Sequence, residues 1–385
     1  MNNFESIFVY QKHYFCMETR LLHPLSKFPG YTSAPYLIAG PCSAETEEQL
    51  IATATSIRQK CPHVQALRAG IWKPRTRPNS FEGIGAEGLK WVKTASAETG
   101  LPIMVEVATP EHVEWALKLG IDMLWIGART TVSPFHVQKL ADALRGINMP
   151  VWIKNPVNPD LELWLGAFER LHHAGVTKLG AIHRGFSTYE KWVYRNPPMW
   201  EIPIEMRRRH PEIPIVVDPS HMSGNRMYIG QLSQQALDMG FDGLMIETHH
   251  QPEKAWSDAR QQVTPDELQD ILSHLTLRQN SQTSAHQSDL EEIRGKIDRI
   301  DNYLMELLSE RMTLSDQIGA LKKELNLTIH QQERWSVIVD RALEKGINGG
   351  LTREFIIKLY QQIHNESIRH QEKWYHKNQE KESQS

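Results

Sequence analysis

Residues 213–221 read IPIVVDPSH, an apolar run rich in β-branched residues that ends in a polar motif. Short runs of this kind are typical of buried strands in a parallel sheet. The pattern occurs eight times, and amphipathic helical stretches separate the runs. The eight runs are Tyr36–Ala39, Val64–Leu67, Pro102–Val107, Asp122–Ile126, Pro150–Ile153, Lys178–Ile182, Ile213–Val217 and Asp242–Ile246.

Strands that alternate with helices predict a parallel sheet, and eight of them predict a closed (β/α)8 barrel, the TIM-barrel fold, over residues 36–277. Helix starts fit this order, because Thr109-Pro110 and Ser133-Pro134 each place proline in a first helical turn. An open doubly wound sheet is the alternative, but no glycine fingerprint follows the first run. Residues 1–35 are expected to form an N-terminal arm.

A second domain of different architecture is expected after the barrel. Residues 278–288 (RQNSQTSAHQS) are polar and predict a flexible linker, residues 289–376 predict an all-α three-helix domain, and 377–385 predict a disordered tail. Apolar residues from Leu290 to Leu325 recur at spacings of 3 and 4, as on a helix roughly 50 Å long at about 1.5 Å per residue. So small a domain cannot cover such a helix, so we expect a homodimer.

Composition narrows the class of protein. A formal charge of -3 over 385 residues gives no field that would attract nucleic acid or an anionic membrane. No stretch is apolar enough for a membrane span. Three cysteines, Cys16, Cys42 and Cys61, are too few for a disulfide framework and indicate a reducing compartment. We therefore expect a cytoplasmic protein without nucleic-acid or membrane partners.

Four potential metal ligands lie where strands are expected to end: Cys42, His221, Glu247 and Asp258. In a parallel barrel the carboxyl ends of the strands meet at one rim, so these side chains should gather there. One thiolate, one imidazole and two carboxylates suit Mn, Fe, Co or Zn better than Mg or Ca. Singly, each also fits a structural role, such as a small buried thiol, a core histidine or a helix cap.

Six cations also follow the apolar runs: Arg68, Lys73, Arg75, Arg129, Lys154 and Arg184. Most Lys and Arg residues lie on solvated faces, but a cation that ends a buried run is costly unless an anion meets it. Guanidinium forks match phosphate and carboxylate geometry. The ligands and cations together predict a metal-assisted reaction between two small phosphorylated anions.

At these residues the chain resembles a known family. In this order, GPCS (40–43), KPRT (73–76), GART (127–130), IKNP (153–156), HRG (183–185), DPSH (218–221) and PEKAWSD (252–258) are similar to motifs of the metal-dependent type I 3-deoxy-D-arabino-heptulosonate 7-phosphate (DAHP) synthases. The resemblance covers residues 36–277. It implies a transferase at the first step of the shikimate pathway, which condenses phosphoenolpyruvate with erythrose 4-phosphate to DAHP and phosphate.

The resemblance also implies residue roles. Cys42, His221, Glu247 and Asp258 would hold one divalent metal ion, with His221 counted in the catalytic set. Phosphoenolpyruvate would meet Arg68 and Lys73 near its carboxylate, and Arg129, Lys154 and Arg184 at its phosphate; Arg75 and Thr76 would hold the phosphate of erythrose 4-phosphate. Lys73 would donate a proton and Glu106 would position or deprotonate water. A synthase using arabinose 5-phosphate is the alternative, but KPRT differs from that family's KANRS-like motif.

The helical domain carries its own polar set. Arg311 interrupts the apolar seam, either to fix oligomer register or to anchor a ligand. The stripe Ile356, Tyr360, Ile363 turns polar at Ser367 and Gln371. Over residues 290–371 this spacing resembles the all-helical chorismate mutases, isomerases that convert chorismate to prephenate. The resemblance implies a chorismate site of Arg311, Lys322, Arg334, Ser367 and Gln371, completed by Arg294 of the partner subunit, with Lys322 and Gln371 at the breaking ether oxygen.

Two residues depart from the mutase pattern. Gln331 and Trp335 stand where that family usually has an acidic pair, so recognition of the substrate hydroxyl should be weaker. The alternative is that the domain is chiefly an allosteric sensor and dimerisation module. Because both activities belong to aromatic amino acid synthesis, we expect prephenate to lower the synthase activity. Isolated residues 288–385 tested for chorismate turnover would separate enzyme from sensor.

Overall fold

The structure is a computed structural model that describes residues 22–74, 81–189, 192–278, 287–329 and 332–376. The chain divides into two compact units, Met1–Asn280 and Ser281–Ser385. In the described residues, no helix is both long enough and apolar enough to cross a membrane.

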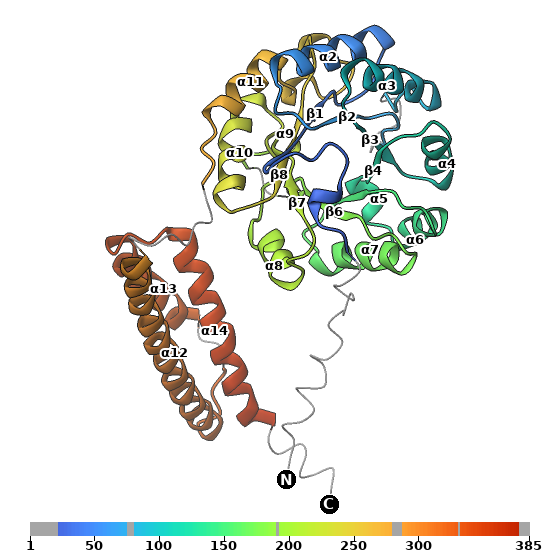
Figure 1. Ribbon diagram of the computed structural model, residues 1–385. Helices are drawn as coiled ribbons and strands as arrows, with labels where there is room; N and C mark the ends of the chain where they lie inside the picture. The colour runs from blue at the N-terminus through green and yellow to red at the C-terminus, as the bar shows by residue number, and fades with distance from the viewer. Residues whose placement is uncertain (1–21, 75–80, 190–191, 279–286, 330–331, 377–385) are drawn as a thin grey trace, which may run out of the picture. The chain divides into compact units, whose positions relative to one another are not determined.

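The first unit is a closed barrel of eight parallel strands in chain order (Figure 1). The strands are β1 Tyr36–Gly40, β2 Ala66–Ala69, β3 Ile103–Val107, β4 Met123–Ile126, β5 Val151–Lys154, β6 Leu179–His183, β7 Ile215–Val217 and β8 Gly243–Glu247. Pairing of β1 with β8, which sets Gly40 beside Glu247, closes the cylinder. β7 begins after Pro214 rather than at the predicted Ile213, since proline has no N–H to donate to the ladder.

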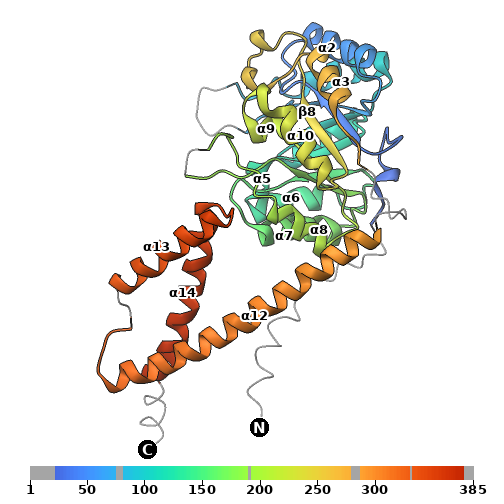
Figure 2. The ribbon, with the colours of Figure 1, turned by 90° about the vertical axis from the view of Figure 1, so that its left-hand side faces the viewer.

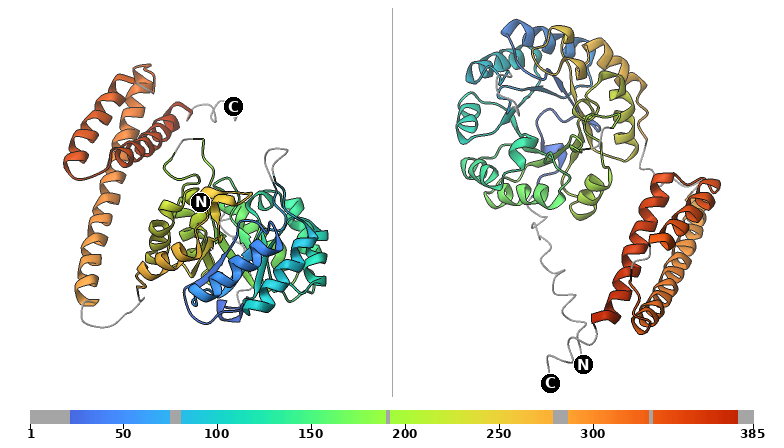
Figure 3. Two further views of the ribbon diagram at one scale, coloured as in Figure 1. Left: turned by 90° about the horizontal axis from the view of Figure 1, so that it is seen from above. Right: turned by 180° about the vertical axis from the view of Figure 1, so that it is seen from behind.

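Helices surround the strands (Figures 1 and 3). They are α2 Glu47–Lys60, α3 Ala86–Thr99, α4 Pro110–Lys118, α5 Ala128–Thr131, α6 Pro134–Ala143, α7 Leu161–His173, α8 Glu201–Arg209, α9 Pro219–Ser223, α10 Ile229–Asp238 and α11 Pro265–His274. Short 3-10 turns lie at Leu25–Lys27 (η2), Arg226–Tyr228 (η3), Pro252–Lys254 (η4) and Ala259–Gln261 (η5). Thr109 and Ser133 cap α4 and α6 with their side chains, and proline follows each, as predicted.

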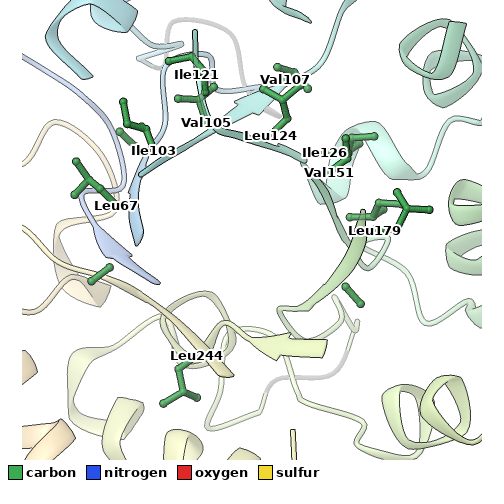
Figure 4. Close-up of a cluster of buried hydrophobic side chains, with 14 of the residues drawn as sticks. Leu67, Ile103, Val105, Val107, Ile121, Leu124, Ile126, Val151, Leu179 and Leu244 are labelled. Carbon is green, nitrogen blue, oxygen red and sulfur yellow. The ribbon is translucent and has the colours of Figure 1, made fainter. Parts of the chain in front are cut away.

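The core has two layers because successive strand residues point to opposite sides of the sheet. Leu67, Ile103, Val105 and others lie on the outer side of the ring of strands, facing the helices (Figure 4). A separate buried cluster fills the cylinder: Tyr36, Ile38, Ala66, Met104, Met123, Trp125, Trp152, Ile182, Val216 and Met245. The barrel is therefore a packed core rather than a pore, and its reactive groups can lie only at its ends.

The chain before β1 packs against the start of the barrel. Phe28 is buried with the inner cluster, and its ring centroid lies 5.0 Å from that of Trp152. The Tyr36 hydroxyl donates a hydrogen bond to the Pro29 carbonyl at 2.7 Å. These contacts close the amino-terminal end of the cylinder, so substrates can reach the inner face only from the opposite rim.

The second unit consists of α12 Gln287–Glu324, α13 Gln332–Asn348 and α14 Arg353–His376 (Figure 2). α14 packs along both α12 and α13, and no other helix among the described residues of this unit lies beside the amino-terminal half of α12 (Figures 2 and 3). Among the described residues, its buried hydrophobic cluster consists of Ala342, Leu343 and Ile356. Ile297 and Ile300 on α12 expose 51% and 64% of their surface. Such a long apolar stripe in water indicates an unsatisfied packing face.

Candidate functional site

The four predicted ligands come together at the carboxyl-terminal rim. Cys42 follows β1, Glu247 ends β8, His221 lies in α9 directly after β7, and Asp258 lies in the segment after β8. Cys42 Sγ is 3.4 Å from Asp258 Oδ2, and His221 Nε2 is 3.7 Å from Glu247 Oε1. Yet among the described residues no three His, Cys, Asp or Glu side chains are grouped closely enough to hold an ion, and the Lys73 ammonium lies 2.6 Å from Cys42 Sγ.

The charges of this cluster suit a cation. Burial, reinforced by Glu247, raises the pKa of the Cys42 thiol to about 12. Burial also acts to raise the pKa of Glu247 and of Asp258, but neighbouring positive groups, including His221 and Lys73, lower both below their usual values. Glu247 Oε1 lies 3.1 Å from Arg68 Nη1, and His221 Nδ1 lies 2.8 Å from Asp218 Oδ2. Two carboxylates, an imidazole and a thiol that a divalent ion would deprotonate fit a borderline metal in donor chemistry.

Asp218 links the ligand set to the cations. Its carboxylate is fully buried and lies 2.8 Å from Lys154 Nζ and 2.8 Å from His221 Nδ1. It also caps α9 by accepting the His221 backbone N–H at 3.0 Å. Burial acts to raise its pKa, but His221 and Lys154 lower it well below its usual value. One ionised carboxylate therefore orients a cation and an imidazole together.

Arg68 and Lys154 share an aromatic surface inside the barrel. Arg68 is 2% exposed, with Nη1 3.1 Å from Glu247 Oε1 and Nη2 donating to the Cys42 carbonyl at 3.2 Å. The Trp125 ring lies under both cations, 4.9 Å from the Arg68 guanidinium and 5.8 Å from Lys154 Nζ. These cation–π contacts and ion pairs hold two positive charges in a dry environment.

Further cations gather around Arg184. Burial lowers the pKa of Arg184 to about 10. The positive charges of Arg195 and Arg129 also lower this pKa, whereas the Asp218 carboxylate acts to raise it. Arg184 is buried whereas Arg129 is exposed. Repulsion among like charges at one place favours a bound anion. Arg75 and Thr76, predicted to hold the second phosphate, lie outside the described residues.

Glu106 reaches the rim through a gap that a glycine leaves. It is half-buried near the end of β3, and a Cβ added to Gly127 would lie 2.0 Å from its Oε1 atom. Its negative charge also acts to raise the pKa of Arg68. Gly127, at the end of β4, therefore permits a carboxylate to lie among the cations.

The helical unit has a pocket of about 350 Å³. Its lining includes five residues of the predicted set, Arg311, Lys322, Arg334, Ser367 and Gln371. Arg311 donates to the Ser367 hydroxyl, and burial lowers the pKa of Arg311 and of Lys322.

One wall of this pocket is aromatic. The Trp335 and His364 rings lie 4.3 Å apart, and no carboxylate is among the described residues that line the pocket. Arg294 is not among those residues either; it is exposed on α12 and pairs with Glu291 at 2.6 Å. Gln331 lies outside the described residues. The pocket is therefore lined by cations of α12 and α13 and by polar side chains of α14, and none of its described lining residues offers a carboxylate to a substrate hydroxyl.

The barrel unit matches a family model over residues 25–283, described as the DAHP synthetase I family. The chain belongs to that family. It is 32% identical over 243 residues to the phospho-2-dehydro-3-deoxyheptonate aldolase of Thermotoga maritima, covering 62% of this chain and 68% of that protein. The crystal structure of that DAHP synthase aligns with a TM-score of 0.56, covering 62% of this chain and 67% of that chain at 32% identity.

Two more relatives match the barrel unit. A truncated Thermotoga maritima 3-deoxy-D-arabino-heptulosonate 7-phosphate synthase aligns with a TM-score of 0.54 at 29% identity, over 62% of this chain and 84% of that chain. The 2-dehydro-3-deoxyphosphooctonate aldolase of Dechloromonas aromatica is 26% identical over 267 residues, which cover 62% of this chain and 89% of that protein.

The helical unit matches a second family model, chorismate mutase type II, over residues 293–372. The DAHP synthetase I chain therefore joins a transferase-family barrel to an isomerase-family helical domain. The predicted resemblance and the predicted fold class, a (β/α)8 barrel followed by a three-helix mutase-like domain, are both confirmed.

Several residues of the DAHP synthetase I rim were not predicted as part of the site. Asp218 could have been found from its place before Pro219, a helix-capping position at the end of a strand. Arg195, which donates to Asp258 Oδ1 at 3.1 Å, lies in a loop, and Gln261, which donates to Glu247 Oε2 at 2.7 Å, lies in the turn η5. No strand end or motif signalled them. The roles of the residues that were predicted stay predictions.

Proposed function

We propose that the barrel condenses phosphoenolpyruvate with erythrose 4-phosphate to give DAHP and phosphate. The observation that carries this proposal is the gathering of Arg68, Lys154 and Arg184, all buried, at the rim that also holds Cys42 and His221. Glu247 and Asp218 already partner Arg68 and Lys154, and a bound anion would offset the positive charge that Arg184 shares with Arg195 and Arg129. The names of the Thermotoga maritima relatives support the same reaction.

Phosphoenolpyruvate would bind by its two ends. Arg129, Lys154 and Arg184 would hold its phosphate, and Arg68 and Lys73 its carboxylate. Asp218, 2.8 Å from Lys154 Nζ, would keep that ammonium oriented before the substrate arrives. Arg75 and Thr76 would hold the phosphate of the aldose. Fixing both substrates converts an encounter of two anions into a reaction between neighbours.

The chemical step needs one new carbon–carbon bond and one broken carbon–oxygen bond. C3 of phosphoenolpyruvate attacks the aldehyde carbon, and Lys73 donates a proton to the aldehyde oxygen as it becomes a hydroxyl. Water adds at C2, positioned or deprotonated by Glu106, and the bond between C2 and the phosphate oxygen then breaks. Cations at the leaving phosphate stabilise the charge that it carries away.

We also propose that one divalent ion, Mn, Fe, Co or Zn, is held by Cys42, His221, Glu247 and Asp258. When bound, it would supply Lewis-acid polarisation of the aldehyde oxygen. Removal with a chelator should abolish synthase activity, and adding back each of the four ions should restore it to different extents. A rate unchanged by complete removal of metal would reject this part of the proposal.

The choice of aldose tests the main proposal. Consumption of phosphoenolpyruvate would be followed with erythrose 4-phosphate and, separately, with arabinose 5-phosphate. The second aldose is the alternative, and the 26% identity to a 2-dehydro-3-deoxyphosphooctonate aldolase is the observation in its favour. We expect turnover with erythrose 4-phosphate, and its absence would overturn the proposal.

For the helical domain we propose rearrangement of chorismate to prephenate. This reaction is intramolecular and needs no proton transfer, so positioning and charge stabilisation suffice. Arg311 and Arg334 would clamp the carboxylates, Ser367 would support Arg311, and Lys322 and Gln371 would face the breaking ether bond. The alternative, a sensor and dimerisation module, is favoured by the absence of a carboxylate among the described lining residues. Chorismate loss catalysed by the full chain distinguishes the two.

We further propose that the mutase site is completed by dimerisation. The amino-terminal half of α12 exposes an apolar stripe, and α13, α14 and the turn between them line an open pocket of about 530 Å³ with mostly apolar residues. Apolar complementarity supports docking of α12 onto a second copy, which would bring Arg294 of the partner subunit to the pocket.

Finally, we propose that prephenate at the helical site lowers synthase activity, and that the protein works in the reducing cytoplasm, where Cys42 and Cys61 stay free thiols. The feedback is tested by the synthase rate at saturating prephenate. An unchanged rate would reject it.

A further inference from the structure

Asp258 lies in a loop that leaves the barrel and returns to it. The loop starts after β8, and it closes where Thr248 forms an isolated bridge with Val263 and the Val263 N–H donates to the Glu247 carbonyl at 3.0 Å. Asp258 has φ 48°, in the left-handed region that non-glycine residues seldom adopt. Such a conformation persists only where surrounding contacts fix it.

Gln262 makes contacts that fix the loop. Its side chain is fully buried, and its amide oxygen accepts the Cys42 backbone N–H at 2.9 Å. Its amide nitrogen donates to the Ser257 carbonyl at 2.9 Å. One side chain therefore joins the backbone that carries Cys42 to the peptide bond that precedes Asp258. Both ends of the amide are used, so neither an acid nor an apolar residue can reproduce the bridge.

Neighbouring residues reinforce this junction. The Glu45 carboxylate accepts the Trp256 backbone N–H at 2.7 Å, and the Ser43 and Ser257 hydroxyls lie 2.7 Å apart. Glu45, Ser43 and Ser257 are all buried. The segment after β1 therefore holds the loop after β8 in place through these hydrogen bonds.

We propose that Gln262 is a positioning residue that holds Asp258 beside Cys42. Its amide bonds to the backbones of Cys42 and Ser257, so it would act through the two backbones that it joins. The proposal rests on the proposed function in one respect, that Asp258 and Cys42 serve the same rim site. Without the bridge, the separation of 3.4 Å between Cys42 Sγ and Asp258 Oδ2 would no longer be fixed.

The first test needs no metal. Gln262→Met keeps the length of the side chain and removes both hydrogen bonds. In metal-free full-length protein, we expect amide hydrogen exchange in peptides from 249–262 to accelerate about tenfold, the effect of losing roughly one net hydrogen bond. Gln65→Met is the matched control, because Gln65 is also buried and bonds to Thr32, Ser33 and Pro35, away from the rim. Equal exchange of 249–262 in wild type and Gln262→Met would overturn the proposal.

The second test measures Co²⁺ affinity through the absorption of a cobalt–thiolate bond. We expect Gln262→Met to weaken binding about 10- to 100-fold, as for other residues that orient ligands, and Gln65→Met to leave it unchanged. In an Asp258→Asn background, Gln262→Met should add less than about threefold, because the residue acts through Asp258. Fully additive losses would overturn the proposal. A wild-type protein that takes up no Co²⁺ would reject the metal site, and the exchange measurement would still decide the role of Gln262.

Discussion

The two candidate sites of this chain differ in the burial of their charged side chains. At the barrel rim, Arg68, Lys154 and Glu247 are buried, and each has an oppositely charged partner within its own chain. In the helical domain, Arg294 and Arg334 are exposed, and the helix that carries Arg294 leaves its apolar stripe in water. A closed sheet delivers side chains from many strands to one place, whereas three helices bring only part of a site together.

This difference has a physical reason. Strand ends in a barrel are fixed by hydrogen bonds to both neighbours, so a side chain on one strand has few positions relative to the next. Helices are fixed only by side-chain packing, and here the buried cluster consists, among the described residues, of Ala342, Leu343 and Ile356. Preorganisation therefore comes from the fold at the rim and must come from association in the helical domain.

The largest effect is expected at the rim. Lys154→Met removes a cation from the proposed phosphate site and breaks the ion pair with Asp218. We expect kcat/KM of the synthase to fall about 10²- to 10³-fold, as when a preorganised charge-stabilising group is lost. Lys60→Met is the control, since Lys60 makes an exposed pair with Asp266 at 2.7 Å, worth at most about 1 kcal/mol. Steady-state kinetics on both variants would check this, and equal rates would remove Lys154 from the site.

Association of two helical domains is tested by placing negative charge in the apolar stripe of α12. The double variant Ile297→Asp with Ile300→Asp should be monomeric, and its chorismate turnover should fall at least about 100-fold because Arg294 of the partner subunit is lost. Sedimentation and chorismate consumption measure the two effects. Asn302→Asp adds a carboxylate to the same helix outside the seam and should change neither. A monomer with full mutase activity would show that one chain suffices.

A carboxylate can be placed in the mutase pocket, whose described lining residues include none. Trp335→Glu should raise kcat/KM for chorismate about tenfold, since one hydrogen bond to a charged acceptor is worth roughly 1.5 kcal/mol or more. Trp335→Gln, of similar size but neutral, should give a smaller gain. The measurement is chorismate consumption by the full chain. No gain from either variant would indicate that the aromatic wall of Trp335 and His364 serves another purpose.

The barrel should also be the unit more sensitive to acid. Burial lowers the pKa of His183 in the folded barrel to about 3, although a hydrogen bond to the Pro198 carbonyl acts to raise it. A histidine in the unfolded chain has a pKa near 6.5. Between these values the unfolded chain binds a proton that the folded barrel does not. Stability is therefore retained above pH about 6.5 and is lost by up to about 1.4 kcal/mol per pH unit as the pH falls toward 3. Thermal unfolding of the barrel at several pH values should show this loss, and His183→Phe should lessen it.

The strand ends could be predicted from sequence because they depend on a local rule. Cys42, Lys154, His221 and Glu247 each follow an apolar run, and parallel pairing puts all such positions at one rim. Arg311, Ser367 and Gln371 could be predicted likewise, since helical periodicity states which residues share a face. Both rules need only the period of the element and the direction of its ends.

What the sequence did not indicate depends on where loops pack. Gln262 and Glu45 contact residues that are far away along the chain, and no period relates them. Arg195 reaches Asp258 from the segment after β6 for the same reason. The exposure of Arg129 was also not foreseeable, because a strand end fixes where a side chain starts and not how far it extends into water.

Phe28 gives the amino-terminal segment a purpose beyond connection. The Phe28 ring lies against Trp152, and the Pro29 carbonyl accepts a hydrogen bond from the Tyr36 hydroxyl, so this segment covers the amino-terminal end of the barrel. A shortened protein that starts at β1 would leave these two aromatic side chains open to solvent at its base. Expression of the barrel alone should therefore keep the chain from Leu22 onward, although every catalytic group proposed for the synthase lies at the other end of the barrel.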